Sequence, residues 1–514
     1  MKQQNSILLL LTLVLAQLAS AQQIVYSETE REDNRKLKFE VIGKIGGQFL
    51  IFKNNHNKSW ISVLDNNMNS VDRVNMDFLP ADERIINIDF FPYSDRALMI
   101  YQYQKKNVVY CMAAKLDPNG KLMEVPRELD TTHISASATN QLYSVISTDD
   151  KKKIAVFKIN SKNKSLYWMT TSYFNDQLVL LGRSKVSIPM EEQKDEIGEF
   201  AINNEGDLFF PKLLRQNGEN IVAASLLMKP YTADTLFQTL LDLNSIQLDE
   251  IKLKVDNNNK RVVLASLYAK EKRGNIEGYY FYCLPWSDLS SPGSFTGITS
   301  TIQRLYSFSD EIRRDANRES TTRTAFNDFY IKQIIIKRDG SFIIASEANY
   351  TTSRNNNFNR WDYYPSPYTY PGYGYYSPYY NRVYNANRGF ANQQVRYHSE
   401  NIVVQSFGKE LAIEWSTVIT KSQFDDETED LLSFSIMNTG GELHFLFDQS
   451  DRRDQLMVDF IIKPGGETSH NSALKNLDRG YDFMPRHAKQ VSAHQFLIPC
   501  VYRNYICFAK LEYN

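Results

Sequence analysis

Short runs of alternating or mainly apolar residues, separated by polar turns, recur along the chain. The segment KFEVIGKIGGQFLIFK shows the pattern, with Gly46 and Gly47 forming a tight turn between two such runs. A second turn follows at Asp65–Asn67. Strands joined by turns this short pair antiparallel, so the segment predicts one four-stranded sheet. The predicted strands are residues 38–45, 48–53, 59–64 and a fourth near Val71.

The same pattern returns from here to the C-terminus. Its turns, such as 203–206, 338–340 and 438–441, contain Asn, Asp and Gly, which tolerate the positive φ that tight turns require. The second predicted set is 85–91, 97–102, 108–116 and 121–125, and the third is 143–147, 153–159, 166–173 and 178–187. Further sets begin near Ile197, Ile251, Tyr330 and Leu431.

Four-strand units that recur at a period of roughly 40 to 60 residues are typical of a β-propeller. A pair of β-sandwich domains also contains short strands and polar turns and is the alternative. Because similar units fill the chain without a linker-like gap, we expect an all-β propeller of roughly seven or eight four-stranded blades in one domain, residues 22–514. The last unit, from about Lys489 to Tyr513, offers three strands, and Gln23–Glu28 is predicted to supply the fourth and close the ring.

One segment that interrupts this pattern has the composition of a helix. In SFSDEIRRDANRES, Ser307 or Ser309 is suited to the N-cap, and two acidic residues follow in the first turn. Arg313 and Arg314 come later, where positive charge stabilises the C-terminal end of a helix. We predict a short surface helix that leads into the strand at Tyr330.

A second interruption is a loop insertion rich in Tyr, Asn and Pro, residues 351–397, which includes YYPSPYTYPGYGYYSPYY. Proline and glycine prevent a packed core there, so one reading is a disordered low-complexity segment. The other reading is a binding loop, because tyrosine offers a large surface with few rotatable bonds and a polar hydroxyl. A disordered loop that orders on contact satisfies both. The candidate partner-binding residues are Arg360, Trp361, Tyr363, Tyr364, Tyr368, Tyr370, Tyr373, Tyr375, Tyr376, Tyr379 and Tyr380.

The N-terminus has the order of a secretory signal peptide. One lysine precedes an apolar run from Ile7 to Leu15, and small residues follow at 19–21. This run is shorter than the roughly 20 residues of a membrane-spanning helix, although a retained anchor is the alternative reading. We expect residues 1–21 to be removed after Ala21 and the mature chain to be secreted or periplasmic, with no membrane span.

Composition narrows the classes of partner. The 59 basic residues nearly balance the 60 acidic residues, which argues against a nucleic-acid binder with a basic face. Four cysteines in 514 residues indicate a core that is not built on disulfides. Cys111 and Cys283 lie in apolar runs and are expected to be buried thiols. Cys500 and Cys507 flank VYRNYI, and a two-residue turn at 503–504 places them opposite each other; whether they form a disulfide stays open.

No signature of a common enzyme chemistry occurs in the sequence, and we predict no cofactor and no metal site. The seven histidines are scattered and are expected to be structural or on the surface. Asp65–Asn69 offers oxygen ligands like a calcium loop, but Ser70 and Met76 replace the glycine and the acidic residue that such a loop requires. An Asx-rich turn is the expected structure there and at 256–259. The acids at 425–427 are expected to form a solvated loop.

The C-terminal part of the chain resembles a group of uncharacterised secreted proteins from Bacteroidota. The resemblance rests on FYIKQIIIKRDGSFIIASEANY, IVVQSF, IEWSTVITKSQ, LSFSIMNTGGELHFLFDQ and IPCVYRNYICFAKLEY, and it covers roughly residues 329–514. It implies a propeller-like fold and an envelope or extracellular location. It carries no known activity, so it assigns no catalytic residue.

These observations favour a non-catalytic binding or scaffold protein of the cell envelope or the extracellular space. Its contacts with an unknown protein or glycan are expected through the loops of one propeller face and the tyrosine-rich insertion. The first alternative is an enzyme acting on polysaccharide or peptide at the central axis, and the second is a structural subunit of an envelope assembly. An axial enzyme needs carboxylates, histidines or arginines that converge, whereas a binder needs a flat or aromatic face.

Overall fold

The described part of the protein is built almost entirely of β-strands. The computed structural model describes residues 23–29, 37–55, 58–80, 84–134, 142–163, 165–190, 195–215, 220–272, 274–290, 301–317, 326–353, 395–426, 428–451, 454–471 and 480–513. In these ranges the strands form seven antiparallel sheets, most of them with four strands, and helices are few and short. The all-β prediction is confirmed, and the architecture is of the propeller-like class.

The first three sheets follow one another in the chain, and each has its strands in sequence order. The first contains β2 (Leu37–Ile45), β3 (Gln48–Asn55), β4 (Lys58–Leu64) and β5 (Ser70–Asn75). The second contains β6 (Arg84–Pro92), β7 (Ala97–Lys105), β8 (Val108–Leu116) and β9 (Arg127–His133). The third contains β10 (Tyr143–Ser147), β11 (Lys153–Asn163), β12 (Leu166–Asn175) and β13 (Leu180–Pro189).

The fourth sheet is larger, with nine strands. It contains β14 (Asp195–Ile197), β15 (Ala201–Ile202), β16 (Leu208–Arg215), β17 (Ile221–Lys229), β18 (Phe237–Leu240), β19 (Gln247–Asp256), β20 (Arg261–Ala269), β21 (Ile276–Pro285) and β22 (Ile302–Ser307). Only one pair of residues, Ile221 and Leu248, joins β17 to β19. The sheet therefore consists of two units of ordinary size whose strands pair at one position and whose faces pack on a shared apolar core.

The last three sheets complete the chain. One contains β23 (Phe329–Ile336), β24 (Phe342–Ser353), β25 (Val395–Phe407), β26 (Ile413–Ile419) and β27 (Gln423–Asp425). The next contains β28 (Phe434–Asn438), β29 (Leu443–Asp451), β30 (Asp454–Ile462) and β31 (Thr468–His470). The final sheet contains β32 (Tyr481–Phe483), β33 (Lys489–Gln490), β34 (Gln495–Tyr502), β35 (Tyr505–Glu512) and the N-terminal β1 (Gln23–Tyr26).

The N-terminal strand joins the C-terminal sheet, as the sequence predicts. β1 pairs antiparallel with β35, with Gln23 opposite Glu512 and Tyr26 opposite Ala509. The Tyr26 ring also stacks on Tyr481 of β32, with ring centroids 4.4 Å apart. Both ends of the described chain are therefore held in one sheet.

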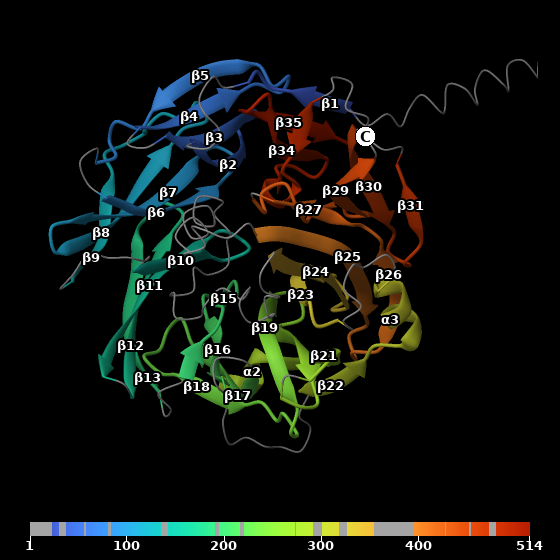
Figure 1. Ribbon diagram of the computed structural model, residues 1–514. Coiled ribbons are helices and arrows are strands. Elements are labelled where there is room, and N and C mark those ends of the chain that lie inside the picture. The colour runs from blue at the N-terminus through green and yellow to red at the C-terminus, as the bar shows by residue number, and fades with distance from the viewer. Residues whose placement is uncertain are drawn as a thin grey trace, which may run out of the picture.

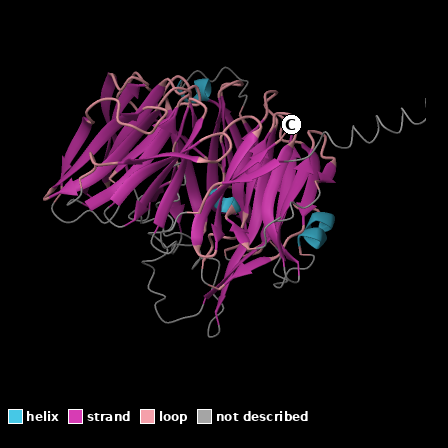
Figure 2. Cartoon of the chain, turned by 90° about the horizontal axis from the view of Figure 1, so that it is seen from above, coloured by secondary structure: helices cyan, strands magenta, loops and turns pink. Residues whose placement is uncertain are grey.

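Neighbouring sheets pack face to face. Figure 1 shows the sheets succeeding one another around the molecule in chain order, with the first strand of each toward the centre and the last toward the rim. Figure 2 shows the same sheets side by side, with their strands running across the thickness of the molecule. One apolar cluster joins the first sheet to the second, and another joins the first sheet to β34 and β35. The first sheet is thus covered on both faces.

Two-residue turns with positive φ connect several of the strand pairs. Gly46 and Gly47 have φ of 56° and 89°, and the Gly46 amide donates to the carbonyl of Ser94 in the next sheet at 2.9 Å. Arg503 and Asn504 adopt φ of 49° and 67°, which is the left-handed pair of a type I′ hairpin. Both turns lie where the sequence predicts them.

The predicted surface helix is also confirmed. It is α3 (Asp310–Ala316), and the Ser309 side chain caps it by accepting from the amide of Ile312. Ile312 and Ala316 are buried against the strands of the neighbouring sheets, and Figure 1 shows α3 at the rim beside β26. The capping serine and the apolar spacing together explain why this short helix forms.

Three predictions of secondary structure are wrong. Residues 121–125 do not form a strand; they make a single bridge through Leu122, and the strand begins after Pro126, which has no amide to donate. The prediction of one helix misses α2 (Trp286–Ser290) and the 3₁₀ turn η1 (Pro485–His487). The insertion is shorter than 351–397, because β24 and β25 continue to residues 353 and 395.

Two predicted segments lie outside the described residues: the signal peptide, residues 1–21, and the rest of the insertion, residues 354–394. In the described ranges, no helix has the length and the apolar character to cross a membrane.

The close approach of β21 and β22 generates a stability prediction. A methyl group on Gly278 overlaps the carbonyl oxygen of Tyr306, whereas a methyl group on Gly182 of β13 meets no atom within 4 Å. Because backbone atoms cannot yield as a side chain does, we expect Gly278→Ala to lower the free energy of unfolding by about 3 kcal/mol. The matched control Gly182→Ala should change it by less than about 0.5 kcal/mol. Urea denaturation of both variants measures this, and equal effects contradict the assignment.

Candidate functional site

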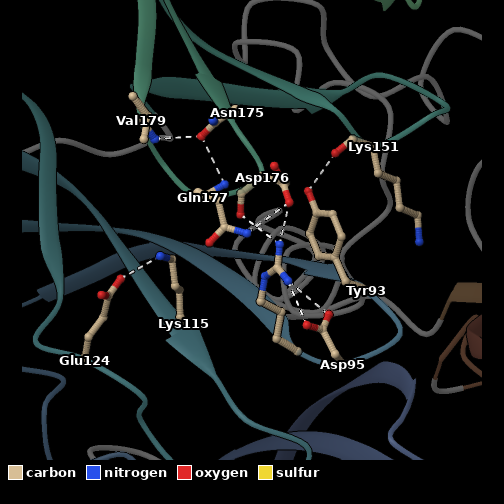
Figure 3. A network of polar contacts seen from close by, with 10 residues as sticks. Tyr93, Asp95, Lys115, Glu124, Lys151, Asn175, Asp176, Gln177 and Val179 are labelled. Atoms are coloured by element: carbon tan, nitrogen blue, oxygen red, sulfur yellow. Dashed lines mark hydrogen bonds and ion pairs between the residues drawn. The ribbon is translucent and has the colours of Figure 1, made fainter.

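The turns between the first and second strands of several sheets contact one another on one side of the molecule, here called the turn face. The Tyr93 hydroxyl donates to the carbonyl of Lys151 at 3.0 Å, and the Lys151 ammonium donates back to the carbonyl of Pro92 at 2.6 Å. Arg96 pairs with Asp176 of the third sheet at 2.6 Å (Figure 3). The second and third sheets are therefore linked by polar contacts as well as by their apolar core.

A ring of amide and carboxylate contacts continues along the turn face. The Asp150 amide donates to the Asn204 side chain at 3.2 Å, and the Asn204 amide donates to the Asn257 side chain at 2.8 Å. The Asn257 side chain then donates to the Asp149 carboxylate at 2.7 Å. Three turns from three consecutive units hold one another in place, which fixes the position of their side chains.

These turns border a cavity of about 400 Å³, which is large enough for a small ligand or part of a larger one. One part of its wall is apolar, formed by Val255 of β19 and by 334–336 of β23. The other part is polar. The polar lining residues are Asp149, Asn204, Lys254, Asp256, Asn257, Asn258 and Gln333.

The polar lining residues divide into two groups. Asp149, Asn204 and Asn257 are committed to the turn contacts, and Asp256 binds Arg261 at 3.2 Å. Among the described residues, the side chains of the other three have no hydrogen-bond or ion-pair partner, and all three residues are exposed to solvent. These three are Lys254, Asn258 and Gln333. The site therefore holds an ammonium and two amides that are free to bind a ligand.

A second polar feature is an ion pair that is fully buried in the interior. The Glu347 carboxylate lies 2.8 Å from the Lys421 ammonium, and both side chains are fully buried. Ser399 and Ser433 donate to the same carboxylate at 2.7 and 2.6 Å, and Lys332 lies 3.5 Å away. Burial opposes the ionisation of Glu347, but the two lysines and the hydrogen bonds outweigh it and hold its pKa at about 2. The Glu347 carboxylate is therefore ionised at neutral pH.

Charged groups from several elements converge around Lys332 of β23. Burial lowers the pKa of Lys332, and this ammonium also experiences the charges of Glu347, Arg486, Glu429 and Glu250. Arg486 and Glu429 form an ion pair of their own at 2.5 Å. Charges of opposite sign from strands, a loop and the turn η1 thus meet around Lys332, and some of them form ion pairs.

One carboxyl group near the centre departs from this pattern. Burial raises the pKa of Asp89 on β6 to about 7, and the charge of Glu40 on β2 acts in the same direction. Asn87 opposes the rise by donating to Asp89 at 2.7 Å. Asp89 is therefore a group that exchanges a proton near neutral pH.

The predicted partner-binding tyrosines, with Arg360 and Trp361, lie outside the described residues. The strands that carry the insertion are described. The rings of Tyr350 on β24 and His398 on β25 stack with centroids 4.5 Å apart. Phe424 of β27 is 59 % exposed, and Arg396 covers its ring at 4.5 Å. The base of the insertion is thus an aromatic and cationic surface.

Other residues discussed from the sequence serve the fold. Asp65 accepts from the amides of Asn67 and Asn69, both at 2.8 Å, which is the predicted Asx turn. His444 is buried, and its Nδ1 lies 3.0 Å from the Asp459 carboxylate. In the described part of the chain, no three His, Cys, Asp or Glu side chains are grouped to hold a metal ion.

The sequence does not reveal the cavity. Lys254 and Gln333 lie on different strands, and each reads as an ordinary solvent-facing residue of an alternating run. The Asn-rich turn at 257–259 is visible in the sequence, but it predicts only a turn. The missing signal is the packing of β19 beside β23, which no local pattern encodes.

Comparison with known proteins identifies no family. No protein-family model matches the chain, and no curated protein is similar to it. Among solved structures, prolyl oligopeptidase B from Galerina marginata is similar with a TM-score of 0.41 at 8 % identity, over 92 % of this chain and 56 % of that chain. A polysaccharide lyase of family PL25, an ulvan lyase, has a TM-score of 0.35 at 8 % identity, over 82 % and 90 % of the two chains. An uncharacterised protein from Listeria monocytogenes EGD-e has a TM-score of 0.36 at 9 % identity, over 83 % and 94 %. Similarity this low assigns no function.

The buried ion pair generates a prediction with a defined pH dependence. Glu347→Gln leaves Lys421 buried without its counter-charge, so we expect a loss of about 3–5 kcal/mol in the free energy of unfolding at pH 7. The folded pKa of Glu347 lies below its ordinary value of 4.5, so its contribution is present above pH 4.5 and is lost as the pH falls toward 2. The difference between wild type and variant should therefore shrink between pH 4.5 and pH 2 in urea denaturation.

The control for this prediction is Asp426→Asn. Asp426 pairs with Arg396 on the surface, where 56 % and 45 % of the two side chains are exposed. Solvent screens this exposed pair, so we expect its loss to change the free energy of unfolding far less than Glu347→Gln does. Similar losses in both variants would show that the Glu347 pair does not stabilise the interior.

Proposed function

We propose that the protein is a closed β-propeller of eight blades that binds a ligand on its turn face without catalysis. Two facts support the blade number: the nine-stranded sheet divides at the single pair between Ile221 and Leu248, and each other sheet forms one unit. The pairing of β1 with β35 supports closure, because it completes the last unit with the first strand of the chain. A closed ring of blades leaves only short, protected sheet edges.

One observation carries the binding role. Lys254, Asn258 and Gln333 line a cavity whose other polar side chains already have partners within the protein. Free donors and acceptors beside an apolar wall are the usual composition of a ligand site. A site that only held the fold together would pair these groups internally, as Glu347 and Lys421 are paired.

The chemistry of the lining favours a glycan. Amides and an ammonium bind the many hydroxyl groups of a sugar, and Val255 with the isoleucines of β23 offers a surface for its apolar side. A peptide segment is the second choice, because its backbone offers similar donors and acceptors. The surface at the base of the insertion, Phe424 with Arg396, adds a further contact for the same partner.

The proposed location is the periplasm or the extracellular space, which the N-terminal sequence supports. The tyrosine-rich insertion is proposed as a second contact with an envelope protein or glycan. Its composition supports this role, since tyrosine and arginine are frequent at recognition surfaces.

An axial enzyme is the second candidate function, and Asp89 is the observation that favours it. A half-buried carboxyl with a pKa of about 7, raised further by a second carboxylate, is suited to general acid or base catalysis. Among the described residues, however, the charges around Lys332 include compensated pairs such as Arg486 with Glu429. Binding at the turn face is therefore the primary proposal.

The binding proposal is tested on the cavity itself. We expect the mature chain to retain glycans from an envelope polysaccharide array, and the double variant Lys254→Ala/Gln333→Ala to bind the best of them at least about tenfold more weakly, since two direct polar contacts are lost. Isothermal titration calorimetry measures the dissociation constant. Lys272→Ala removes an exposed lysine between β20 and β21 and is the control. Equal affinity of the double variant and this control contradicts the proposed site.

The enzymatic candidate has a separate test. Asp89→Asn keeps the size of the side chain but removes its proton exchange. If the wild type releases products from a bound glycan or peptide, and Asp89→Asn binds equally but releases none, the axial enzyme is supported. Product release that is absent from the wild type, or unchanged in the variant, excludes a catalytic role for Asp89.

A further inference from the structure

The hairpin of β34 and β35 places two cysteines directly opposite each other. Cys500 pairs with Cys507, and Tyr502 pairs with Tyr505 on either side of the two-residue turn. The two sulfur atoms lie 2.8 Å apart, and both residues are fully buried. The sulfur atoms need to approach by roughly 0.8 Å to reach the length of a disulfide bond, about 2.05 Å. The backbone register already supplies the required proximity.

No other cysteine competes for this pairing. Cys111 lies on β8 of the second sheet, and Cys283 lies on β21 of the nine-stranded sheet. Each of them is buried without a second cysteine in its own sheet. Cys500 and Cys507, in the final sheet, are thus the one pair of cysteines placed to form an intramolecular disulfide.

The surroundings of the pair decide when the bond forms. Burial raises the pKa of the Cys500 thiol, and the neighbouring Cys507, Asp448 and Asp482 raise it further. The reactive thiolate is therefore scarce in the folded protein. An external oxidant also has no access, because neither sulfur is exposed.

The N-terminal strand adds to this protection. The hydroxyl oxygen of Ser27, which follows β1, accepts a hydrogen bond from the Phe508 amide at 3.0 Å. The Ser27 amide donates a hydrogen bond to the Phe508 carbonyl at 2.8 Å. This contact covers the free edge of β35 next to Cys507. We therefore expect Cys500 and Cys507 to be accessible only before β1 pairs with β35 in the final sheet.

We propose that Cys500 and Cys507 form a disulfide bond during folding, before β1 joins β35. The two thiols lose two protons and two electrons as the sulfur–sulfur bond forms. The electrons reduce one disulfide of an oxidising partner, such as oxidised glutathione or a thiol–disulfide exchange protein, to two thiols. The bond fixes the register of the hairpin on which both β1 and β32 pair.

Trypsin provides a direct readout, because Arg503 lies between the two cysteines. Cleavage gives peptide 490–503 with Cys500 and peptide 504–510 with Cys507. A disulfide keeps these two peptides together under non-reducing conditions. Cys111 and Cys283 are internal controls in the same sample.

The full chain is unfolded and reduced, refolded in a buffer of reduced and oxidised glutathione, and alkylated before digestion. Mass spectrometry is expected to find the linked pair 490–503 with 504–510 as the main form, with Cys111 and Cys283 alkylated. The variant Cys111→Ser/Cys283→Ser should give the same linked pair. Separate, fully alkylated peptides overturn the proposal, whether or not the chain binds a ligand.

The timing is tested on protein that is already folded. Reduced native protein is placed in the same glutathione buffer, and linkage of the two peptides is followed over time. We expect linkage at least tenfold slower than during refolding. Equal rates overturn the part of the proposal that places the bond before closure of the sheet.

Discussion

The fold depends on the fact that its sheets are apolar on both faces. Alternate residues of one strand face different neighbours: in β3, Phe49 and Ile51 pack toward β34 and β35, whereas Leu50 and Phe52 pack toward the second sheet. A sheet with one free face would expose several large side chains to water, at a cost of about 1.5–3 kcal/mol for each. Each unit of this kind therefore requires a neighbour on either side, and the proposed ring would supply two neighbours to every unit.

The centre of the molecule follows a different rule from the interfaces between sheets. Charged residues also lie in the interior, and burying them is unfavourable unless each finds a counter-charge or hydrogen bonds. Glu347 satisfies this condition with Lys421 and two serines. The turn face differs, since its asparagines hold the turns in place and leave other polar groups unpaired. Polar groups that are paired within the fold and polar groups that are available to a ligand thus lie in different parts of the protein.

Much of the fold is visible in the sequence because its signals are local. Alternating apolar runs and turns of Asn, Asp and Gly predict most strands, and Ser309 with the acids after it predicts α3. The predictions fail where tertiary contacts, rather than local sequence, determine the structure. The fourth strand of the second sheet, β9, is mainly polar. Residues 121–125 are more apolar and therefore resemble a strand more closely, although Pro126 separates them from β9. The cavity and the buried ion pair join residues from distant segments, and no spacing in the chain indicates them.

The attachment of β1 to β35 also bears on the order in which the chain folds. β1 is made first, but its hydrogen-bonding partner is among the last residues to be synthesised. Until then β1 is an unpaired strand of mainly apolar residues, QIVY, of the kind that aggregates with other chains. Assembly must therefore wait for the complete polypeptide, and a truncated product keeps a free edge that marks it as unfinished.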